Sequence, residues 1–350
     1  MTNDPLSYEK IYSLPKYSDM IRMIDEQPAY YKKGLELGQK IKKEELANPR
    51  TVFFYGIGGS GIVGLLVSGI FSSFTRIPIL ASNAVRIPDW LSQDDLLIVV
   101  SYSGETYEAL RAFNEAIKRR IRLLAMTSGG SLAEIANRNN IQLIELSKGF
   151  PPRMSLPEMV GAAISTLDNT DITKNASETL LQAVDMLTEI AEKNGPSSPY
   201  QNNTAKKAAL HFYNGFPSVF CSGHLYFTGL RLKNQLNENA KYPCVVHEIP
   251  ESMHNTLEAL PYSDMDKYLL LRSSSEPKDV SAQMRFISSS FSHKVMEVWF
   301  KGNEVYESIA SIMWADYVST YLAALREVDP ITVARIAALR KEVEKSLKNT

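Results

Sequence analysis

Three glycines and a serine lie together in one short turn of the chain. Gly56, Gly58 and Gly61 follow the apolar run TVFF at residues 51–54, and Ser60 precedes the last of them. A glycine turn between a strand and a helix lets backbone N–H groups approach an anion at the positive end of the helix. The stretch GIGGSG therefore predicts a site for a phosphate group.

The spacing G-x-G-x-x-G is also typical of dinucleotide-binding sites, which need an acidic residue about 20 positions later to hold a ribose hydroxyl. Here the second predicted strand ends in LASNAVR, which places Ser82 and Asn83 at that point. Because neither residue is a carboxylate, we expect no nicotinamide or flavin cofactor.

A second polar turn follows the third predicted strand. The segment VVSYSGET carries Ser101, Ser103 and Thr106 and runs into a helix. The carboxyl ends of neighbouring parallel strands line one crevice, so this turn should face the same ligand as Gly59 and Ser60. Four hydroxyls and two helix N-termini suit a compact dianion such as a monophosphate. The alternative for SYSGET alone is plain helix capping.

The elements that position these loops alternate along the chain. From residue 50 to residue 146, strand-length apolar runs alternate with helix-length amphipathic segments. Runs that are apolar throughout are typical of parallel strands buried on both faces. After NGPSSPYQNN at residues 194–203 the alternation resumes, without a second glycine loop. The sequence predicts an α/β protein with two doubly wound, flavodoxin-like parallel sheets.

The predicted organisation has five parts. They are a helical segment at 1–48, a phosphate-binding α/β domain at 49–170, a linker helix and loop at 171–204, a second α/β domain at 205–328, and a C-terminal helix at 329–350.

Composition excludes several classes of partner for this 350-residue chain. A formal charge of -1 and a pI near 6.6 leave no basic excess, so we expect no nucleic acid partner. The start of the chain lacks a signal-peptide pattern and no apolar run approaches about 18 residues, so we expect no membrane segment and a cytoplasmic location. Cys221 and Cys244 lack the spacing of a metal or redox motif, and we expect no metal.

GIGGSG at residues 56–61 with SYSGET at residues 101–106 resembles the sugar isomerase (SIS) domain, which binds phosphosugars through such serines and threonines. The resemblance extends over nearly the whole chain and is to the bifunctional phosphoglucose/phosphomannose isomerases, a compact branch of the phosphoglucose isomerase superfamily. It implies two SIS domains and a cofactor-free enzyme that interconverts glucose 6-phosphate and fructose 6-phosphate, and also mannose 6-phosphate.

Such an isomerase needs a ring opener, a base that moves a proton between C1 and C2, and a cation beside the enediolate. Helical spacing places Glu238 with Leu230 and Asn234, away from the apolar stripe of its helix. NENAK at 237–241 resembles the family segment that carries the catalytic glutamate, which implies that Glu238 is the base. The alternative is a solvated surface glutamate.

PESMHNTLEAL resembles the histidine loop of the family, which implies that His254 protonates the ring oxygen. Relatives usually have a glutamate two residues later, where this chain has Thr256. In the family the histidine comes from the neighbouring subunit, so the resemblance implies a homodimer with shared active sites. The remaining histidines lack a matching context and are expected at the surface or hydrogen-bonded in the core: His211, His224, His247 and His293.

GFPPRMS follows the fifth predicted strand, and its two prolines stiffen the loop that carries Arg153. The resemblance implies that Arg153 lies against the enediolate oxygens. The alternative is a loop arginine that packs over Phe150 or pairs with an acid.

The last predicted helix presents a choice between Arg340 and Lys341. Relatives end in a pattern like D-P-x-P-V-x-x-I-x-x-L-K, whose lysine helps to open the ring, and DPITVARIAALRK places Arg340 at that position. An arginine acts near neutral pH only as a cation and donor. Either Arg340 has an electrostatic role, or the helix shifts by one residue to present Lys341. Helical phase places Arg340 on a predicted inward stripe with Val333, Ile336, Val343 and Leu347.

Thr332, near the start of that helix, matches a small residue that in relatives leaves room for the C2 substituents to turn over, which implies use of mannose 6-phosphate. The rival class is a SIS protein that senses a phosphosugar without turnover. Sensors usually append a DNA-binding segment, which this sequence lacks, and have no need of Glu238 and His254. We therefore favour the isomerase.

Overall fold

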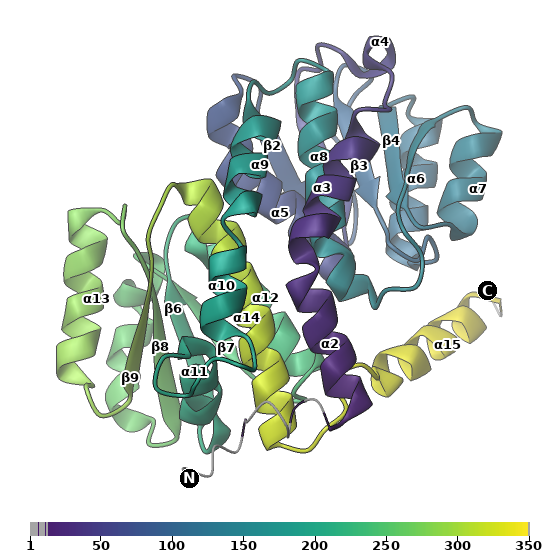
Figure 1. Cartoon of the computed structure of the whole chain (residues 1–350). Helices are drawn as coiled ribbons and strands as arrows, with labels where there is room; N and C mark the ends of the chain where they lie inside the picture. The colour runs from purple at the N-terminus through teal and green to yellow at the C-terminus, as the bar shows by residue number, and fades with distance from the viewer. Residues whose placement is uncertain (1–5, 7–10, 12, 349–350) are drawn as a thin grey trace.

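The computed structural model describes residues 6, 11 and 13–348. It contains two parallel sheets with helices on both faces, and a long helix and the N-terminal helices lie between them (Figure 1). The predicted class, two doubly wound parallel sheets, is confirmed. Of the helices in the described part of the chain, none is long and apolar enough to cross a membrane.

The first sheet has the strand order β2-β1-β3-β4-β5, with all neighbours parallel. Every residue of β1 and β3 is buried because helices cover both faces. The order reverses between β1 and β3, which opens a crevice at their carboxyl ends. The elements are β1 (Val52–Gly56), α5 (Gly59–Ile70), β2 (Ile79–Ser82), β3 (Leu96–Val100), α6 (Tyr107–Lys118), β4 (Arg122–Thr127), α7 (Gly130–Arg138), β5 (Gln142–Glu145), η2 (Pro152–Ser155) and α8 (Leu156–Asn169).

The second sheet repeats this plan in the order β7-β6-β8-β9, with its reversal between β6 and β8. Two short helices, α9 (Ala176–Asp185) and α10 (Thr188–Asn194), connect the two sheets. The elements are α11 (Thr204–Tyr213), β6 (Phe216–Cys221), α12 (Leu225–Glu238), β7 (Val245–Glu248), η3 (Glu251–His254), β8 (Asp266–Ser273), α13 (Lys278–Ser290), β9 (Val295–Phe300) and α14 (Glu304–Leu325).

The N-terminal helices α2 (Pro15–Asp25) and α3 (Gln27–Gly38) lie along α8 and α14, and a short helix α4 (Lys43–Leu46) follows (Figure 1). The backbones of α3 and α8 touch at glycines. A Cβ atom at Gly34 would lie 2.2 Å from the carbonyl oxygen of Glu158, and one at Gly161 would lie 2.4 Å from that of Tyr31. Only glycine permits this approach, so these two helices lock the N-terminal segment to the first sheet.

The helix α14 is buried over nearly its whole length and forms the centre of the molecule. Its Asp316 accepts hydrogen bonds from Arg231 on α12 at 3.0 Å, from Gln235 at 2.7 Å and from Gln27 on α3 at 2.8 Å. Because all four side chains are almost fully buried, this network fixes the end of α12 relative to the first domain.

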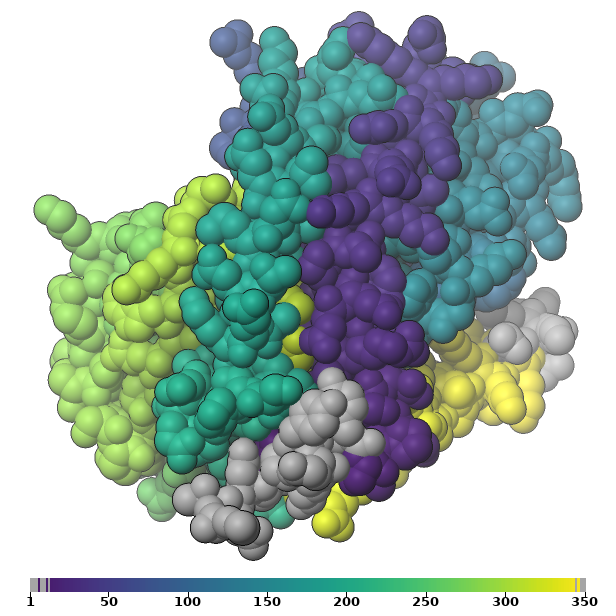
Figure 2. Space-filling model, viewed as in Figure 1, coloured from purple at the N-terminus to yellow at the C-terminus, as the bar shows by residue number. Residues whose placement is uncertain are grey.

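The last helix, α15 (Ala334–Lys348), extends along the outside of the molecule (Figures 1 and 2). Its predicted inward stripe is wrong for the single chain, because Ile336 is 40% exposed and Val343 is 39% exposed. Leu339, on the same helix, is 64% exposed. The physical reason is that this helix does not lie against the body of its own chain. The side chain of Leu347 is not among those that the structure describes.

Candidate active site

The glycine loop joins β1 to α5 at the carboxyl edge of the first sheet. Gly58 caps α5 with a φ of 61°, a conformation that favours glycine, and no side chain caps this helix. The loop presents backbone N–H groups at the open start of a helix, as an anion site requires. A Cβ at Gly59 would lie 3.3 Å from the Cα of Arg153, so the loop also lies directly beside that residue.

The serine-rich turn after β3 touches the glycine loop. The backbone N–H of Tyr102 donates to the hydroxyl of Ser60 at 3.2 Å, and the hydroxyl of Ser101 donates to that of Thr106 at 3.2 Å. Thr106 is the N-cap residue of α6, yet its side chain makes no capping bond. Ser103 accepts from the backbone N–H of Glu105 at 3.3 Å and shapes the turn. Side-chain capping therefore does not account for Thr106, and the turn that carries these hydroxyls lies beside Ser60 of the glycine loop.

Arg153 lies in η2, immediately before α8, and is 3% exposed. Its Nε donates to Oδ1 of Asn239 at 2.7 Å, and its Nη2 donates to the carbonyls of Pro330 at 2.6 Å and Ile331 at 3.0 Å. Burial lowers the pKa of Arg153, and the nearby carboxylate of Glu238 partly opposes that shift. Arginine nevertheless stays protonated, so a fixed cation joins both domains and the segment before α15.

Glu238 is the last residue of α12, and its Oε2 lies 3.5 Å from Nη1 of Arg153. The side chain of Glu238 is 25% exposed, whereas that of Arg153 is buried. The carboxylate is thus held beside a buried cation and still has an open side. This environment differs from that of a solvated surface glutamate, and it leaves room for a ligand to approach Glu238.

Two further residues of the segment NENAK belong to this cluster, although the sequence patterns did not point to them. Asn239 binds Arg153 through its oxygen and donates from Nδ2 to the hydroxyl of Ser319 at 2.9 Å. The Nζ of Lys241 donates to the carbonyl of Thr332 at 2.8 Å and to that of Glu238. Burial, and next the charge of Arg153, lower the pKa of Lys241. The available signal was their position directly after the candidate base.

His254 lies away from this cluster. It ends η3, which follows the carboxyl end of β7, and it is exposed. Glu238 ends α12, which runs back to the opposite edge of the same sheet before β7 begins. Among the described residues, no hydrogen bond or ion pair involves the His254 imidazole. At the position where relatives have a glutamate, Thr256 donates its hydroxyl to Oδ1 of Asn255 at 2.9 Å.

The C-terminal candidates divide into two groups. Thr332 lies beside the cluster, because its carbonyl accepts from Lys241 and its hydroxyl donates to Asp329 at 2.5 Å. Arg340 and Lys341 both lie on α15 with exposed side chains, and neither reaches Glu238 or Arg153 in the described part of the chain. The structure therefore does not favour either of them over the other.

The other histidines differ among themselves. His211 is partly buried with Nε2 3.1 Å from the Tyr268 carbonyl, and Nε2 of His224 lies 2.8 Å from Glu307. Burial lowers the pKa of His211 and that of His247, whereas His293 is exposed. These positions agree with the expectation of core or surface histidines.

Two protein-family models match this chain, and each of them covers one of the two sheets. The SIS domain matches residues 45–149, and the bacterial phospho-glucose isomerase C-terminal SIS domain matches residues 201–343. The solved structure of tagatose-6-phosphate ketose/aldose isomerase from Escherichia coli has the same fold, with a TM-score of 0.69 at 16% identity. That similarity covers 92% of this chain and 96% of the solved one.

Curated relatives align with both halves at once. The bifunctional phosphoglucose/phosphomannose isomerase of Caldicellulosiruptor bescii is 25% identical over 96% of this chain and 98% of its own length. The enzyme of the same name from Aquifex aeolicus is 29% identical over 86% of this chain and 93% of its own length. The resemblance of the glycine loop and its companion turn to a SIS domain is thereby confirmed: the chain carries two regions that match SIS-domain families, and it is similar over most of its length to the bifunctional phosphoglucose/phosphomannose isomerases.

Proposed function

We propose that this protein is an aldose–ketose isomerase that interconverts glucose 6-phosphate and fructose 6-phosphate, and also converts mannose 6-phosphate. The observation that carries the proposal is the contact between a phosphate-type crevice and a carboxylate–guanidinium pair. Gly59 lies against Arg153, and Arg153 lies against Glu238. A sugar phosphate anchored in the crevice therefore reaches both groups.

The phosphate of the substrate binds at the carboxyl edge of the first sheet. The backbone at the start of α5 and the hydroxyls of Ser60, Ser101, Ser103 and Thr106 supply its donors. Two helix N-termini at this crevice favour a dianion electrostatically. Binding energy from the phosphate, which does not react, then holds the carbon chain in place for proton transfer.

Glu238 acts as the base in a cis-enediol mechanism. Its carboxylate removes the proton from C2 of the open-chain aldose, the C–H electron pair forms the C1–C2 double bond, and the π pair of the C1 carbonyl moves to O1, which gives an enediolate. A proton passes from the C2 hydroxyl to O1. The electron pair on O2 then forms the C2 carbonyl while the same carboxyl group returns its proton to C1, which gives the ketose. The partial exposure of Glu238 provides the access that this step requires.

Arg153 stabilises the negative charge that develops on the enediolate oxygens. Its guanidinium is held by Asn239 and by two backbone carbonyls, so it needs no reorganisation when the charge forms. Lys241 adds a second cation at the same edge. The sequence resemblance assigns ring opening to His254 and to Arg340 or Lys341, and these residues stay candidates for that step.

We further propose a homodimer with shared sites. Glu238 and His254 lie at opposite edges of the second sheet, so the two groups of one chain do not meet. A second copy brings its own His254 to the Glu238 of the first. In such a dimer, the exposed apolar face of α15 can pack against the second copy.

The test follows fructose 6-phosphate by proton NMR in deuterium oxide, with chelator present and no nucleotide. Wild type is expected to form glucose 6-phosphate with deuterium at C2. Glu238→Gln keeps the shape of the base but removes its basicity, so turnover should fall by orders of magnitude while substrate still binds. Glu248→Gln, a change at an exposed carboxylate that ends the next strand, β7, is the matched control and should stay active.

The rival function, a phosphosugar sensor without turnover, predicts a different result. Wild type would then bind the sugar phosphate in the crevice and leave it unchanged, and Glu238→Gln would not alter the outcome. A wild-type protein that binds but never converts either substrate would therefore overturn the isomerase and favour the sensor.

A further inference from the structure

The second sheet has a crevice that corresponds to the phosphate crevice of the first. Its strands reverse order between β6 and β8, as those of the first sheet do between β1 and β3. The turn after β6 has Gly223 with a φ of 52°, as the turn after β1 has Gly58 with a φ of 61°. The turn after β8 reads SSSE at 273–276 and is rich in hydroxyls like its counterpart.

A carboxylate of the chain itself fills this second crevice. Glu307, in the first part of α14, is fully buried and reaches across the carboxyl ends of three adjacent strands. Its Oε1 accepts from the backbone N–H of Ser274 at 3.2 Å, from the hydroxyl of Ser274, and from the backbone N–H of Gly302 at 3.1 Å. Its Oε2 accepts from the hydroxyl of Ser273 and lies 2.8 Å from Nε2 of His224.

These hydrogen bonds favour the ionised form of Glu307. Burial alone would raise its pKa, but hydrogen bonds from His224, Ser273 and Ser274 outweigh burial and hold the pKa below its usual value. An ionised carboxylate has about four lone-pair sites, and five donors meet them here. Backbone N–H groups, hydroxyls and an imidazole therefore form a complete cage around one small oxyanion.

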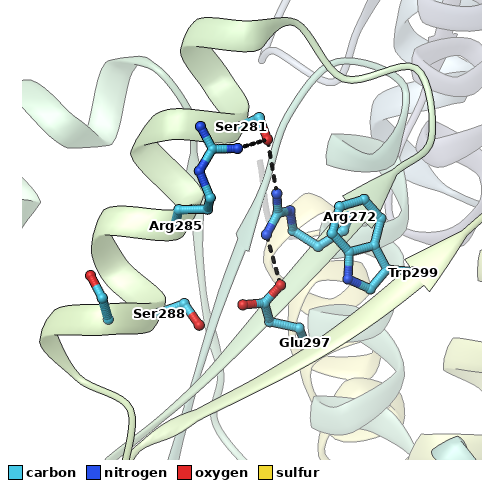
Figure 3. Close-up of a pocket in the computed structure, with 7 residues that line it drawn as sticks. Arg272, Ser281, Arg285, Ser288, Glu297 and Trp299 are labelled. Carbon is cyan, nitrogen blue, oxygen red and sulfur yellow. Dashed lines mark hydrogen bonds and ion pairs between the residues drawn. The ribbon is translucent and has the colours of Figure 1, made fainter.

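The cation next to this cage, Arg272, pairs with other carboxylates and not with Glu307. Arg272 precedes Ser273 on β8, and alternate residues of a strand point to opposite faces. Figure 3 shows Arg272 pointing toward Glu297 and Ser281, beside Trp299. Its Nη1 donates to Glu297 at 2.7 Å, and it also pairs with Glu276. The cage around Glu307 thus resembles the proposed phosphate site of the first crevice, which consists of hydroxyls and backbone groups rather than an arginine fork.

We propose that the crevice of the second sheet is an oxyanion site whose resident ligand is the carboxylate of Glu307. The crevice of the first sheet is consequently open to a sugar phosphate, whereas the side chain of Glu307 fills the crevice of the second sheet. The comparison with the first crevice rests on the proposed function, whereas the cage itself does not. A small external carboxylate or phosphate should enter once the glutamate side chain is removed.

Glu307→Ala tests the inference, because the atoms that it removes correspond to acetate. We would measure the melting temperature of this variant while acetate replaces chloride at constant ionic strength. In chloride, it should melt several degrees below wild type, because buried donors lose their acceptor. Acetate should restore most of that loss in a saturable way, since a ligand that binds the folded state stabilises it.

Glu307→Gln is the matched control, because it keeps the side-chain volume and leaves no space for acetate. It should melt below wild type and gain no more from acetate than wild type does. The inference is overturned if acetate stabilises all three proteins equally, if it acts no better than chloride on Glu307→Ala, or if that variant stays unfolded at every acetate concentration.

A separate variant keeps this result apart from the proposed function. Ser101→Ala changes the first crevice and should weaken binding of inorganic phosphate to the wild-type background several-fold. It should leave the response of Glu307→Ala to acetate unchanged, because the two crevices lie on different sheets. If Ser101→Ala binds inorganic phosphate as tightly as wild type, the proposed substrate site is contradicted. If acetate fails to stabilise Glu307→Ala, the caged carboxylate is contradicted.

Discussion

At the scale of single residues, Arg153 connects the parts of the candidate site. Its backbone lies against the glycine loop, and its guanidinium contacts Asn239, two carbonyls before α15, and Glu238. The three positions of its planar fork are therefore all used. A lysine, with a single ammonium group on a flexible chain, cannot make all of these contacts.

Arg153→Lys keeps the charge but breaks the fork, so it tests whether geometry or charge matters. We expect kcat for fructose 6-phosphate to fall about 10²- to 10³-fold, as for loss of one donor to a developing oxyanion. KM should change less, because the phosphate contacts stay in place. Steady-state kinetics measure both values. Arg285→Lys, an exposed change on α13, is the control, and equal kcat values for all three proteins would rule out this role for Arg153.

Lys241 shows why part of the site escaped prediction from the sequence. NENAK pointed to Glu238 through helical spacing and family resemblance. Lys241 lies after the helix end, with a φ of 54° that turns the chain, and its Nζ meets Thr332 from a segment about 90 residues away. Contacts of that kind depend on how distant elements pack, and a local pattern does not contain them.

At the scale of elements, the strands and loops were well predicted because their signals are local. Fully apolar runs gave buried parallel strands, and the glycine loop followed β1 as expected. The last helix was different. The sequence indicates its apolar residues Ile336 and Val343, but the expected inward direction is wrong, because this helix does not lie against the body of its own chain.

The contact between α3 and α8 carries a prediction at this scale. Gly34→Ala places a methyl group 2.2 Å from the carbonyl oxygen of Glu158, so one helix must move. Overpacking of this kind costs about 1–3 kcal/mol. Urea unfolding should show that loss in the free energy of unfolding. Lys33→Ala, on the exposed face of the same helix, should be nearly neutral, and a neutral Gly34→Ala would contradict the tight packing described above.

At the scale of the whole molecule, the candidate site residues lie at opposite edges of the second sheet. Glu238 and Arg153 face the first crevice, whereas His254 lies beyond β7 at the far edge. If a second copy supplies the histidine, every complete site contains residues of two chains. Activity then belongs to the assembly rather than to one chain.

Mixing two inactive variants tests this division. Glu238→Gln and His254→Gln each remove a group from every site of their own homodimer. After subunit exchange, a mixed dimer carries one site with both groups intact, so about a quarter of the sites should recover in an equal mixture at random pairing. Isomerase activity and native mass spectrometry measure recovery and exchange. Full exchange without recovered activity would place His254 and Glu238 of one chain in the same site.

The contact of α3 with α14 has a consequence for synthesis of the chain. Gln27 bonds to Asp316 across 289 residues, and at ribosomal rates of about 5–20 residues per second that interval lasts roughly 15–60 s. Helix α2, which packs mainly on α14, therefore leaves the ribosome long before its partner exists, whereas α3 waits only for α8. During that time the apolar face of α2 is available to chaperones and to neighbouring nascent chains, and it becomes covered only when the chain is nearly finished.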